Sequence, residues 1–195
     1  MDLTQTDINK KCIKYISEKI DKNIVLRILN LSYNDLGRAC IYIKNLLIKE
    51  TNIRILKLVS CKIYKDISLV FQGLCKNNNL ETFDISSNSF IKNKNVLTDI
   101  VNFFKENKKL LNLSLDNTRI DDTGINFISQ GIGLNNSIKK LSLKINFITE
   151  ENIDLLIDNI KNNKIIRKIE LAGNGISKKG IEYVNSILYD KLNKK

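Results

Sequence analysis

Leu26-x-x-Leu29-x-Leu31-x-x-Asn34-x-Leu36 is the stretch that decides the fold, because this eleven-residue pattern recurs six times along the chain. The first positions of successive copies are 27, 27, 30, 28 and 28 residues apart. A near-constant period in this range predicts a solenoid, in which each unit buries its apolar face only against its neighbours. The other five copies begin at Ile53, Leu80, Leu110, Ile138 and Ile166.

Each copy predicts a short strand followed by a helix, and therefore an α/β class. Alternating apolar residues such as Leu29 and Leu31 are typical of a strand with one buried face. The segment after a copy changes to helical spacing, as in Ile125, Ile128 and Ile132. Expected helix N-caps are Asp121, Thr149 and Ser177. The wider spacing between the third and fourth copies predicts a lengthened loop near Ile91–Asn95.

The ninth position of the pattern is expected to form a structural ladder rather than a site. Backbone groups need partners where the chain turns inward after a strand, and a buried asparagine offers both a donor and an acceptor. Cysteine and threonine stand in for asparagine in two copies. The ladder residues are Asn34, Cys61, Asn88, Thr118, Asn146 and Asn174.

These repeats resemble the leucine-rich repeat proteins, and their length is similar to that of the ribonuclease-inhibitor-like subtype. The resemblance implies a right-handed curved solenoid of six repeats, with a parallel β-sheet on the concave face and helices on the convex face. It also implies that binding is the expected kind of function, although the scaffold hosts many unrelated activities. It transfers no functional residue, because the matched positions are structural.

The chain is expected to be a single leucine-rich repeat domain spanning 1–195. The spacing of Ile8, Ile13, Ile16 and Ile20 matches that of a later helix, so residues 1–23 predict an N-terminal half-repeat whose helix shields the first strand. Residues 24–176 hold the repeats. Residues 177–195 predict a C-terminal capping helix, since an apolar stripe there lies among lysines.

Composition argues against an enzyme. The chain has no histidine, which excludes Ser-His and Cys-His nucleophile systems. It has no phosphate-binding loop, and Gly131 and Gly133 lie late in a predicted helix, where glycine ends helices. The acidic pairs Asp121/Asp122 and Glu150/Glu151 lie at helix starts, where they complement the helix dipole. No cofactor and no metal is expected.

The four cysteines have no C-x-x-C spacing and are expected to be small buried residues in a reducing compartment. No apolar run is long enough to span a membrane, and the acidic start is not that of a secretory signal. The expected location is therefore cytoplasmic, with a nuclear location as the alternative.

The outward positions of the strands are the expected contact surface, namely the third, fifth, seventh and eighth of each copy. The first two copies place apolar side chains there, the middle copies small and acidic ones, and the fifth copy basic ones. Outward apolar residues are what a partner would cover, although single exposed apolar residues are also common. The hypothetical contact residues are Tyr33, Lys57, Asp84, Asp116, Lys144 and Phe147.

The preferred function is a non-catalytic protein–protein interaction module or scaffold, acting as a monomer on a partner that the sequence does not name. Two alternatives rest on resemblance: a regulator of a small GTPase, by similarity to the Ran GTPase-activating proteins, and a regulator of actin filaments, by similarity to the tropomodulin repeat domain. A third is weak binding of nucleic acid or acidic lipid through the net charge of +11. Most of the cations are lysines, whereas sequence-specific recognition of bases in a DNA groove relies on the forked guanidinium group of arginine.

Overall fold

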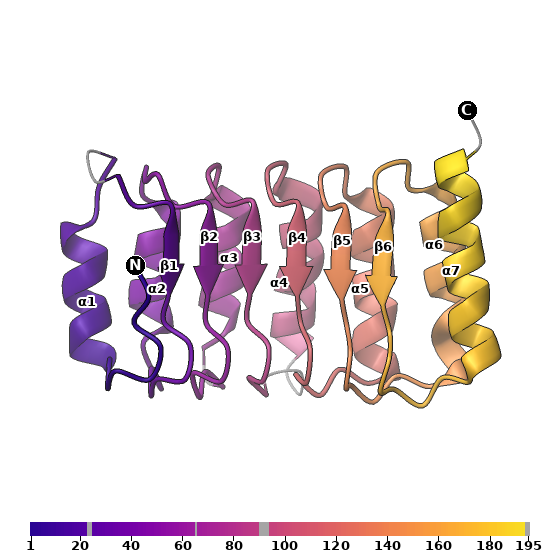
Figure 1. Ribbon diagram of the computed structural model, residues 1–195, viewed down its shortest axis with the longest axis horizontal. Helices are drawn as coiled ribbons and strands as arrows, with labels where there is room; N and C mark the ends of the chain where they lie inside the picture. Colours follow the sequence, from indigo (N-terminus) through magenta and orange to yellow (C-terminus); the bar gives the residue numbers. More distant parts are fainter. Residues whose placement is uncertain (23–24, 65, 90–93, 194–195) are drawn as a thin grey trace.

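The computed structural model describes residues 1–22, 25–64, 66–89 and 94–193. Within these residues the chain alternates short strands with helices (Figure 1). The strands are β1 Ile28–Asn30, β2 Ile55–Lys57, β3 Thr82–Asp84, β4 Asn112–Ser114, β5 Lys140–Ser142 and β6 Lys168–Glu170. The helices are α1 Lys10–Lys19, α2 Cys40–Ile48, α3 Ser68–Lys76, α4 Lys94–Glu106, α5 Asp122–Leu134, α6 Ile153–Asn162 and α7 Lys178–Asn193, with a 3₁₀ turn η1 Glu150–Asn152.

The predicted α/β solenoid is confirmed. The strands form one parallel sheet in sequence order, so each of the inner strands β2 to β5 pairs with the copies before and after it. The sheet lies on one face of the molecule and the helices lie behind it (Figure 1). Strands in a sheet lie roughly 4.8 Å apart, whereas packed helices need about 8–10 Å. The sheet is therefore the inner, concave side of the arc.

The core lies between the two layers and runs the length of the molecule. The middle residue of each strand points into it, and Leu29, Leu56 and Phe83 are buried accordingly. Phe71, Phe103 and Phe104 fill the centre. The ring centroids of Phe71 and Phe103 are 6.0 Å apart, and those of Phe103 and Phe104 are 5.2 Å apart. Among the described helices, none combines the length and the hydrophobicity that crossing a bilayer requires.

The first edge of the sheet is covered by the N-terminal segment. Asp2 bridges to Asn30 in parallel, and the Leu3 amide donates to the Asn30 carbonyl over 2.9 Å. The Gln5 amide donates to the Ser32 carbonyl over 3.0 Å. Helix α1 lies in the helical layer beside α2 and not at the edge of the sheet (Figure 1). The extended segment 1–5, which was not expected from the sequence, therefore provides the backbone partners of β1 on this edge.

The ninth-position residues saturate the backbone of the turns that follow the strands. The Asn88 side chain accepts from the amides of Cys61 and Ile63 over 3.0 Å each, and it donates to the carbonyls of Leu58 and Ile85 over 2.8 Å each. Asn34 and Asn146 make the same pattern. At Cys61 a thiol contacts the Leu31 carbonyl instead.

A second asparagine ladder, which the sequence analysis did not identify, runs along the opposite ends of the strands. Its members are buried, begin just past a helix and lie three residues before a copy of the pattern. Each side-chain amide donates to a carbonyl near the end of the helix one copy earlier, as from Asn77 to Leu47 in α2. Each side-chain oxygen accepts backbone amides two or three residues ahead. At the last copy the Lys191 ammonium replaces the asparagine and donates to the carbonyls of Ile160 and Asn163. The four asparagines are Asn77, Asn107, Asn135 and Asn163.

Gly131 and Gly133 lie late in a helix as expected, in the last turn of α5, which ends at Leu134. Gly131 is also a packing position: a Cβ there would lie 2.6 Å from the Phe104 ring. Asp121 and Ser177 accept amide bonds three residues ahead as N-caps, and Thr149 caps η1. The loop expected near Ile91–Asn95 lies largely outside the described residues.

Candidate functional site

The outer surface of the sheet is a set of rows that cross the strands. Parallel register places Ile28 beside Ile55, and Lys140 beside Lys168. The same register aligns each further outward position with its equivalent in the next copy. Neighbouring side chains in a row are thus about 4.8 Å apart at their backbones, close enough to act together on one partner.

The eighth position of every copy has a left-handed backbone, which the sequence analysis did not anticipate. In the first five copies its amide reaches the seventh position of the next copy; the Tyr33 amide, for example, donates to the Val59 carbonyl over 2.8 Å. Asparagine and glycine tolerate a positive φ, whereas a β-branched or bulky side chain there is strained. The residues and their φ angles are Tyr33 60°, Ser60 53°, Ser87 58°, Asn117 52°, Ile145 56° and Gly173 77°.

Two of these strained residues carry large apolar side chains that are exposed. Tyr33 is 58% exposed and Ile145 is 63% exposed. Phe147, two residues beyond Ile145, is also 63% exposed. Their side chains therefore contribute little burial to offset the backbone strain, which costs about 1–3 kcal/mol at such positions. Residues of this kind concentrate at functional sites.

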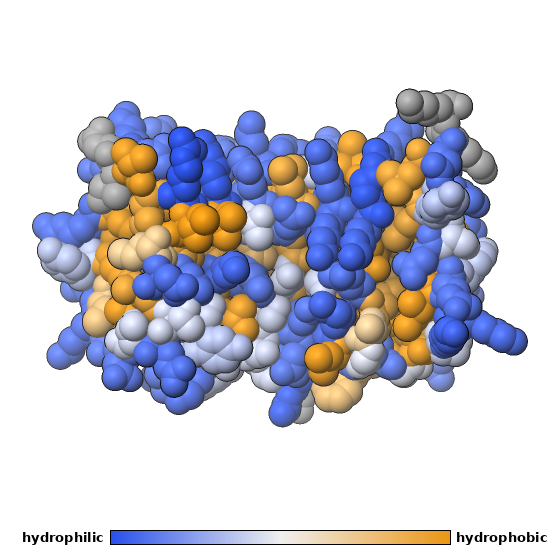
Figure 2. Space-filling model, viewed as in Figure 1, coloured by the Kyte–Doolittle hydropathy of each residue, from blue (hydrophilic) through white to orange (hydrophobic). Residues whose placement is uncertain are grey.

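A second apolar group lies on the strands of the first two copies. Ile28 is 47% exposed, and Ile55 and Val59 are half-buried beside it. Figure 2 shows this group as a hydrophobic area over β1 and β2. We call Ile28, Tyr33, Ile55 and Val59 the apolar patch.

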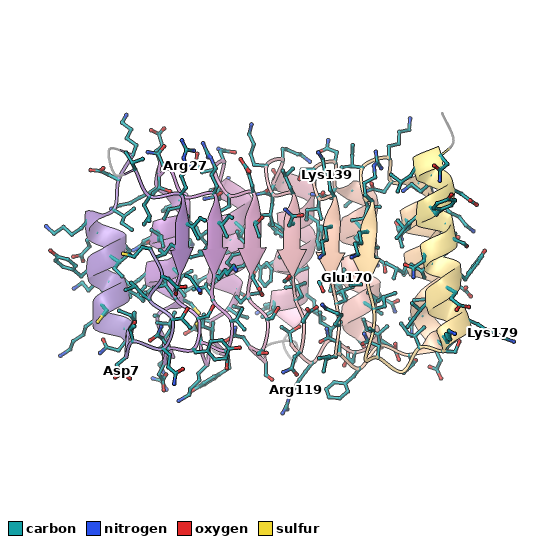
Figure 3. The ribbon with its side chains drawn as sticks, in the orientation of Figure 1. Asp7, Arg27, Arg119, Lys139, Glu170 and Lys179 are labelled. Carbon is teal, nitrogen blue, oxygen red and sulfur yellow. The ribbon has the colours of Figure 1, made fainter. Side chains whose placement is uncertain are left out.

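The opposite half of the face is an ion-pair cluster centred on Glu170 (Figure 3). The Glu170 carboxylate lies 2.9 Å from the ammonium groups of both Lys168 and Lys140, and 4.0 Å from that of Lys144. The bond from Lys168, followed by those from Lys140, lowers the Glu170 pKa to about 2. Lys144 also lies 3.6 Å from the Asp116 carboxylate. The cluster therefore presents mostly compensated charge rather than the uniformly basic surface expected of the fifth copy.

The six hypothetical contact residues do not form a single cluster. Asp116 and Lys144 are in contact, and the Asp116 carboxylate also accepts the Lys144 amide over 2.8 Å and the Ser142 hydroxyl over 2.6 Å. Lys57 is exposed on β2, and Asp84 is half-buried at the end of β3. Tyr33 and Phe147 belong to the first and fifth copies, so four strand spacings, about 19 Å, separate them.

Three outward positions are not available to a partner. Ser32, Ser86 and Ser142 are buried, and the Ser142 hydroxyl is held by the Asp116 carboxylate. The hydroxyls of Ser32 and Ser86 accept the amides of Val59 and Asp116 over 3.1 Å and 3.2 Å. The residues that the prediction missed are Glu170, Lys140 and Lys168, although their shared third and fifth positions were visible in the pattern.

The described residues offer little chemistry of other kinds. Burial raises the pKa of the Cys40 thiol to about 12 and that of the Cys61 thiol to about 11, so neither is a ready nucleophile. In the same part of the chain, no group of three or more acidic or cysteine side chains is placed to hold a metal ion.

These features define a leucine-rich-repeat-type solenoid, and the similarity to one solved structure, a region of leiomodin-1, agrees at the level of the fold. No protein-family model matches the chain, and no curated protein matches it in sequence. A structure of actin-binding site 2 of leiomodin-1 is similar, with a TM-score of 0.56 and 18% identity over 69% of this chain and 78% of that one. The tropomodulin C-terminal domain of Caenorhabditis elegans aligns over 95% of this chain and 93% of that one, with a TM-score of 0.38 and 13% identity.

Proposed function

We propose that the protein is a non-catalytic interaction module that binds a partner protein through its concave strand face. The observation that carries the proposal is the pair of strained, exposed side chains Tyr33 and Ile145. Equivalent positions in the other copies hold serine, asparagine or glycine, so the repeat itself does not require an apolar residue there. A partner that covers these side chains would recover the apolar burial that the free protein lacks.

The proposed partner presents an apolar segment flanked by few charges. Its apolar side chains would cover the apolar patch, because aromatic and aliphatic anchors dominate binding energy at interfaces. The ion-pair cluster around Glu170 would form part of the polar rim, since its lysines already have acidic neighbours. Lys57, which lies between Ile55 and Val59 in the second copy, and Asp84 beside it on β3 would fix orientation more than affinity.

Several finer assignments are part of this proposal. We assign the chain no catalytic activity, since it has no histidine and its most buried thiols have raised pKa values. We assign it to the ribonuclease-inhibitor-like subtype because most copies combine a period near 28 residues with a full helix. We place it in the cytoplasm or the nucleus, because its cysteines are buried or half-buried without any C-x-x-C spacing, which suits small core residues in a reducing compartment.

Actin is the first partner to test by name. The leiomodin-1 region with a similar fold is described as an actin-binding site, although 18% identity supports similarity of fold alone. Co-sedimentation with filaments and the rate of pyrene-actin elongation would test this candidate. A regulator of a small GTPase would instead accelerate GTP hydrolysis, which a phosphate-release assay measures.

The main experiment compares affinity capture by the wild type and by a strand-face variant. The variant carries Tyr33→Ser, Ile145→Asn and Phe147→Ser, of which the first two introduce residue types that other copies hold at the eighth position. A control variant carries Ile41→Ser, Leu155→Ser and Tyr183→Ser, which lie exposed on helices. Each captured protein is then purified and titrated against all three forms.

We expect a directly binding protein whose affinity falls at least about 30-fold in the strand-face variant, as for loss of a buried anchor. The control variant should bind like the wild type. Thermal unfolding should show that both variants remain folded. If every captured protein binds all three forms equally, the strand face is not the interaction surface.

A further inference from the structure

The two edges of the solenoid differ in charge. The segments that follow a helix and lead into a strand contain nine lysines and arginines and three acidic residues, a net of +6. These segments are 20–27, 49–54, 77–81, 107–111, 135–139 and 163–167. We call them the helix-end edge. The opposite edge is formed by the segments that precede a helix. Their described residues contain four cations and eight acidic residues, a net of −4; these lie in 1–9, 31–39, 58–64, 66–67, 85–89, 115–121, 143–152 and 171–177.

The fold gathers this positive charge along one side. All repeats run in the same direction, so helix C-termini and strand starts share one edge, the upper one in Figure 1. Arg27 and Lys139 lie there in Figure 3, whereas Asp7, Arg119 and Lys179 lie along the opposite edge. The edge extends from α1 to α7 as a nearly straight row of loops (Figure 1).

Helix dipoles do not account for all of these cations. Lysine near a helix C-terminus can bind the last carbonyl groups. Here asparagine amides already occupy such carbonyls, with Asn77 bound to Leu47 and Asn107 to Leu74 over 2.7 Å each. Within the described residues, four exposed edge cations have a side-chain ammonium or guanidinium group with no hydrogen bond or ion pair, although their backbone groups do form hydrogen bonds. These are Arg27, Lys109, Lys139 and Lys164.

Exposed apolar side chains lie in this edge and at the ends of the helices that border it. Val25 is 85% exposed, and Ile48 and Leu134, the last residues of α2 and α5, are 49% and 54% exposed. Leu192, near the end of α7, is 49% exposed. Figure 2 shows hydrophobic side chains interspersed with hydrophilic ones along this edge. Cations that alternate with protruding apolar side chains are typical of surfaces that lie on a membrane.

We propose that the helix-end edge binds the surface of a bilayer rich in anionic lipid. The cations would attract the negative surface, and Val25, Ile48 and Leu134 would enter the boundary between headgroups and acyl chains. Single-stranded nucleic acid fits less well, because it stacks on a series of aromatic side chains. The segments of the helix-end edge contain none, and Tyr189, one turn before Leu192 in α7, is a single exposed ring beside them. The strand face is separate from this edge, so the protein on a membrane would still present that face to a partner.

The test measures partition of the full chain onto large vesicles by flotation. Vesicles contain phosphatidylcholine alone or with 30% phosphatidylserine, at about 50 and 150 mM salt. The edge variant carries Arg27→Gln, Lys109→Gln, Lys139→Gln and Lys164→Gln. A matched variant of the same net charge carries Arg38→Gln, Lys62→Gln, Arg119→Gln and Lys179→Gln, at the other edge. An apolar variant carries Val25→Ser, Ile48→Ser and Leu134→Ser.

We expect partition onto anionic vesicles, with a loss of about 50-fold or more in the edge variant and less than about fivefold in the matched variant. The apolar variant should partition about tenfold more weakly, while its binding to duplex DNA and to single-stranded oligonucleotide stays unchanged. Three outcomes would overturn the proposal: equal losses in the edge and matched variants, no loss in the apolar variant, or tighter binding to nucleic acid than to anionic vesicles at the same salt. Circular dichroism establishes that each variant is folded.

Discussion

Replacement of Asn146 by alanine tests whether the ninth-position ladder stabilises the fold. Asn146 is buried, and its side-chain oxygen accepts the amides of Thr118 and Ile120 over 3.0 Å each. Its side-chain amide donates to the carbonyls of Leu115 and Leu143 over 2.9 Å each. The substitution therefore leaves two N–H groups and two carbonyl groups without these partners.

The expected cost follows from those groups. A buried polar group without a partner costs about 1–3 kcal/mol, and a water molecule admitted to the vacated space would satisfy some of them. We expect the free energy of unfolding to fall by about 3–5 kcal/mol. Asn174→Ala is the matched control: Asn174 is half-buried in the last copy and accepts the Ile148 amide over 3.1 Å. Its cost should be about 1–2 kcal/mol.

Urea unfolding followed by far-ultraviolet circular dichroism measures both values. The comparison is informative because both variants lose the same amide group at equivalent positions of the repeat. The reasoning is refuted if Asn146→Ala costs no more than Asn174→Ala, because burial of the orphaned groups would then not set the penalty.

Three further predictions concern packing, pH and thiols. Gly131→Ala should destabilise the protein by about 1–3 kcal/mol, because the new methyl group meets the Phe104 ring. Gly133→Ala should cost less, because its methyl group meets the amide of the Asn159 side chain, which can move. Differential scanning calorimetry should show a lower melting temperature for Gly131→Ala than for Gly133→Ala. Glu170→Gln should cost about 1 kcal/mol at pH 7. Because the folded-state pKa of Glu170 is lowered to about 2, its stabilisation is complete above its ordinary pKa of 4.5 and is lost as pH falls towards 2. Urea titrations at pH 7 and pH 2.5 should show the difference between wild type and variant shrinking, and a constant difference would contradict it. Cys40 and Cys61 should resist maleimide at pH 8 while the half-buried Cys12 reacts, and mass spectrometry of the labelled native protein checks the order.

The architecture was predictable because the repeat encodes it redundantly. Leu29, Leu31 and Asn34 have equivalents in the later copies, so a single atypical residue such as Cys61 does not obscure the pattern. The second ladder was also visible in principle, since Asn107 and Asn135 stand at the same place in their copies. It was missed because asparagine is abundant and the loops in which it lies carry no apolar signal.

Features of the candidate site were less accessible to sequence reasoning. The eighth position holds tyrosine, serine, asparagine, isoleucine and glycine, which share no backbone preference, so its left-handed conformation comes from hydrogen bonding between copies. Burial of Ser32 and Ser142 depends on where each hydroxyl finds an acceptor or a donor. The convergence of lysines on Glu170 depends on side-chain conformation as well as on register.

The strict order of the sheet also has a kinetic consequence. Every strand pairs with the next one along the chain, and the ladder bonds join residues about one repeat apart. Each step of assembly therefore closes a loop of similar length, for which the entropic cost grows only with the logarithm of the number of residues. Folding can begin at any pair of adjacent copies and spread in both directions. A chain with additional copies would meet the same barrier at every step, so its folding rate should depend little on its length.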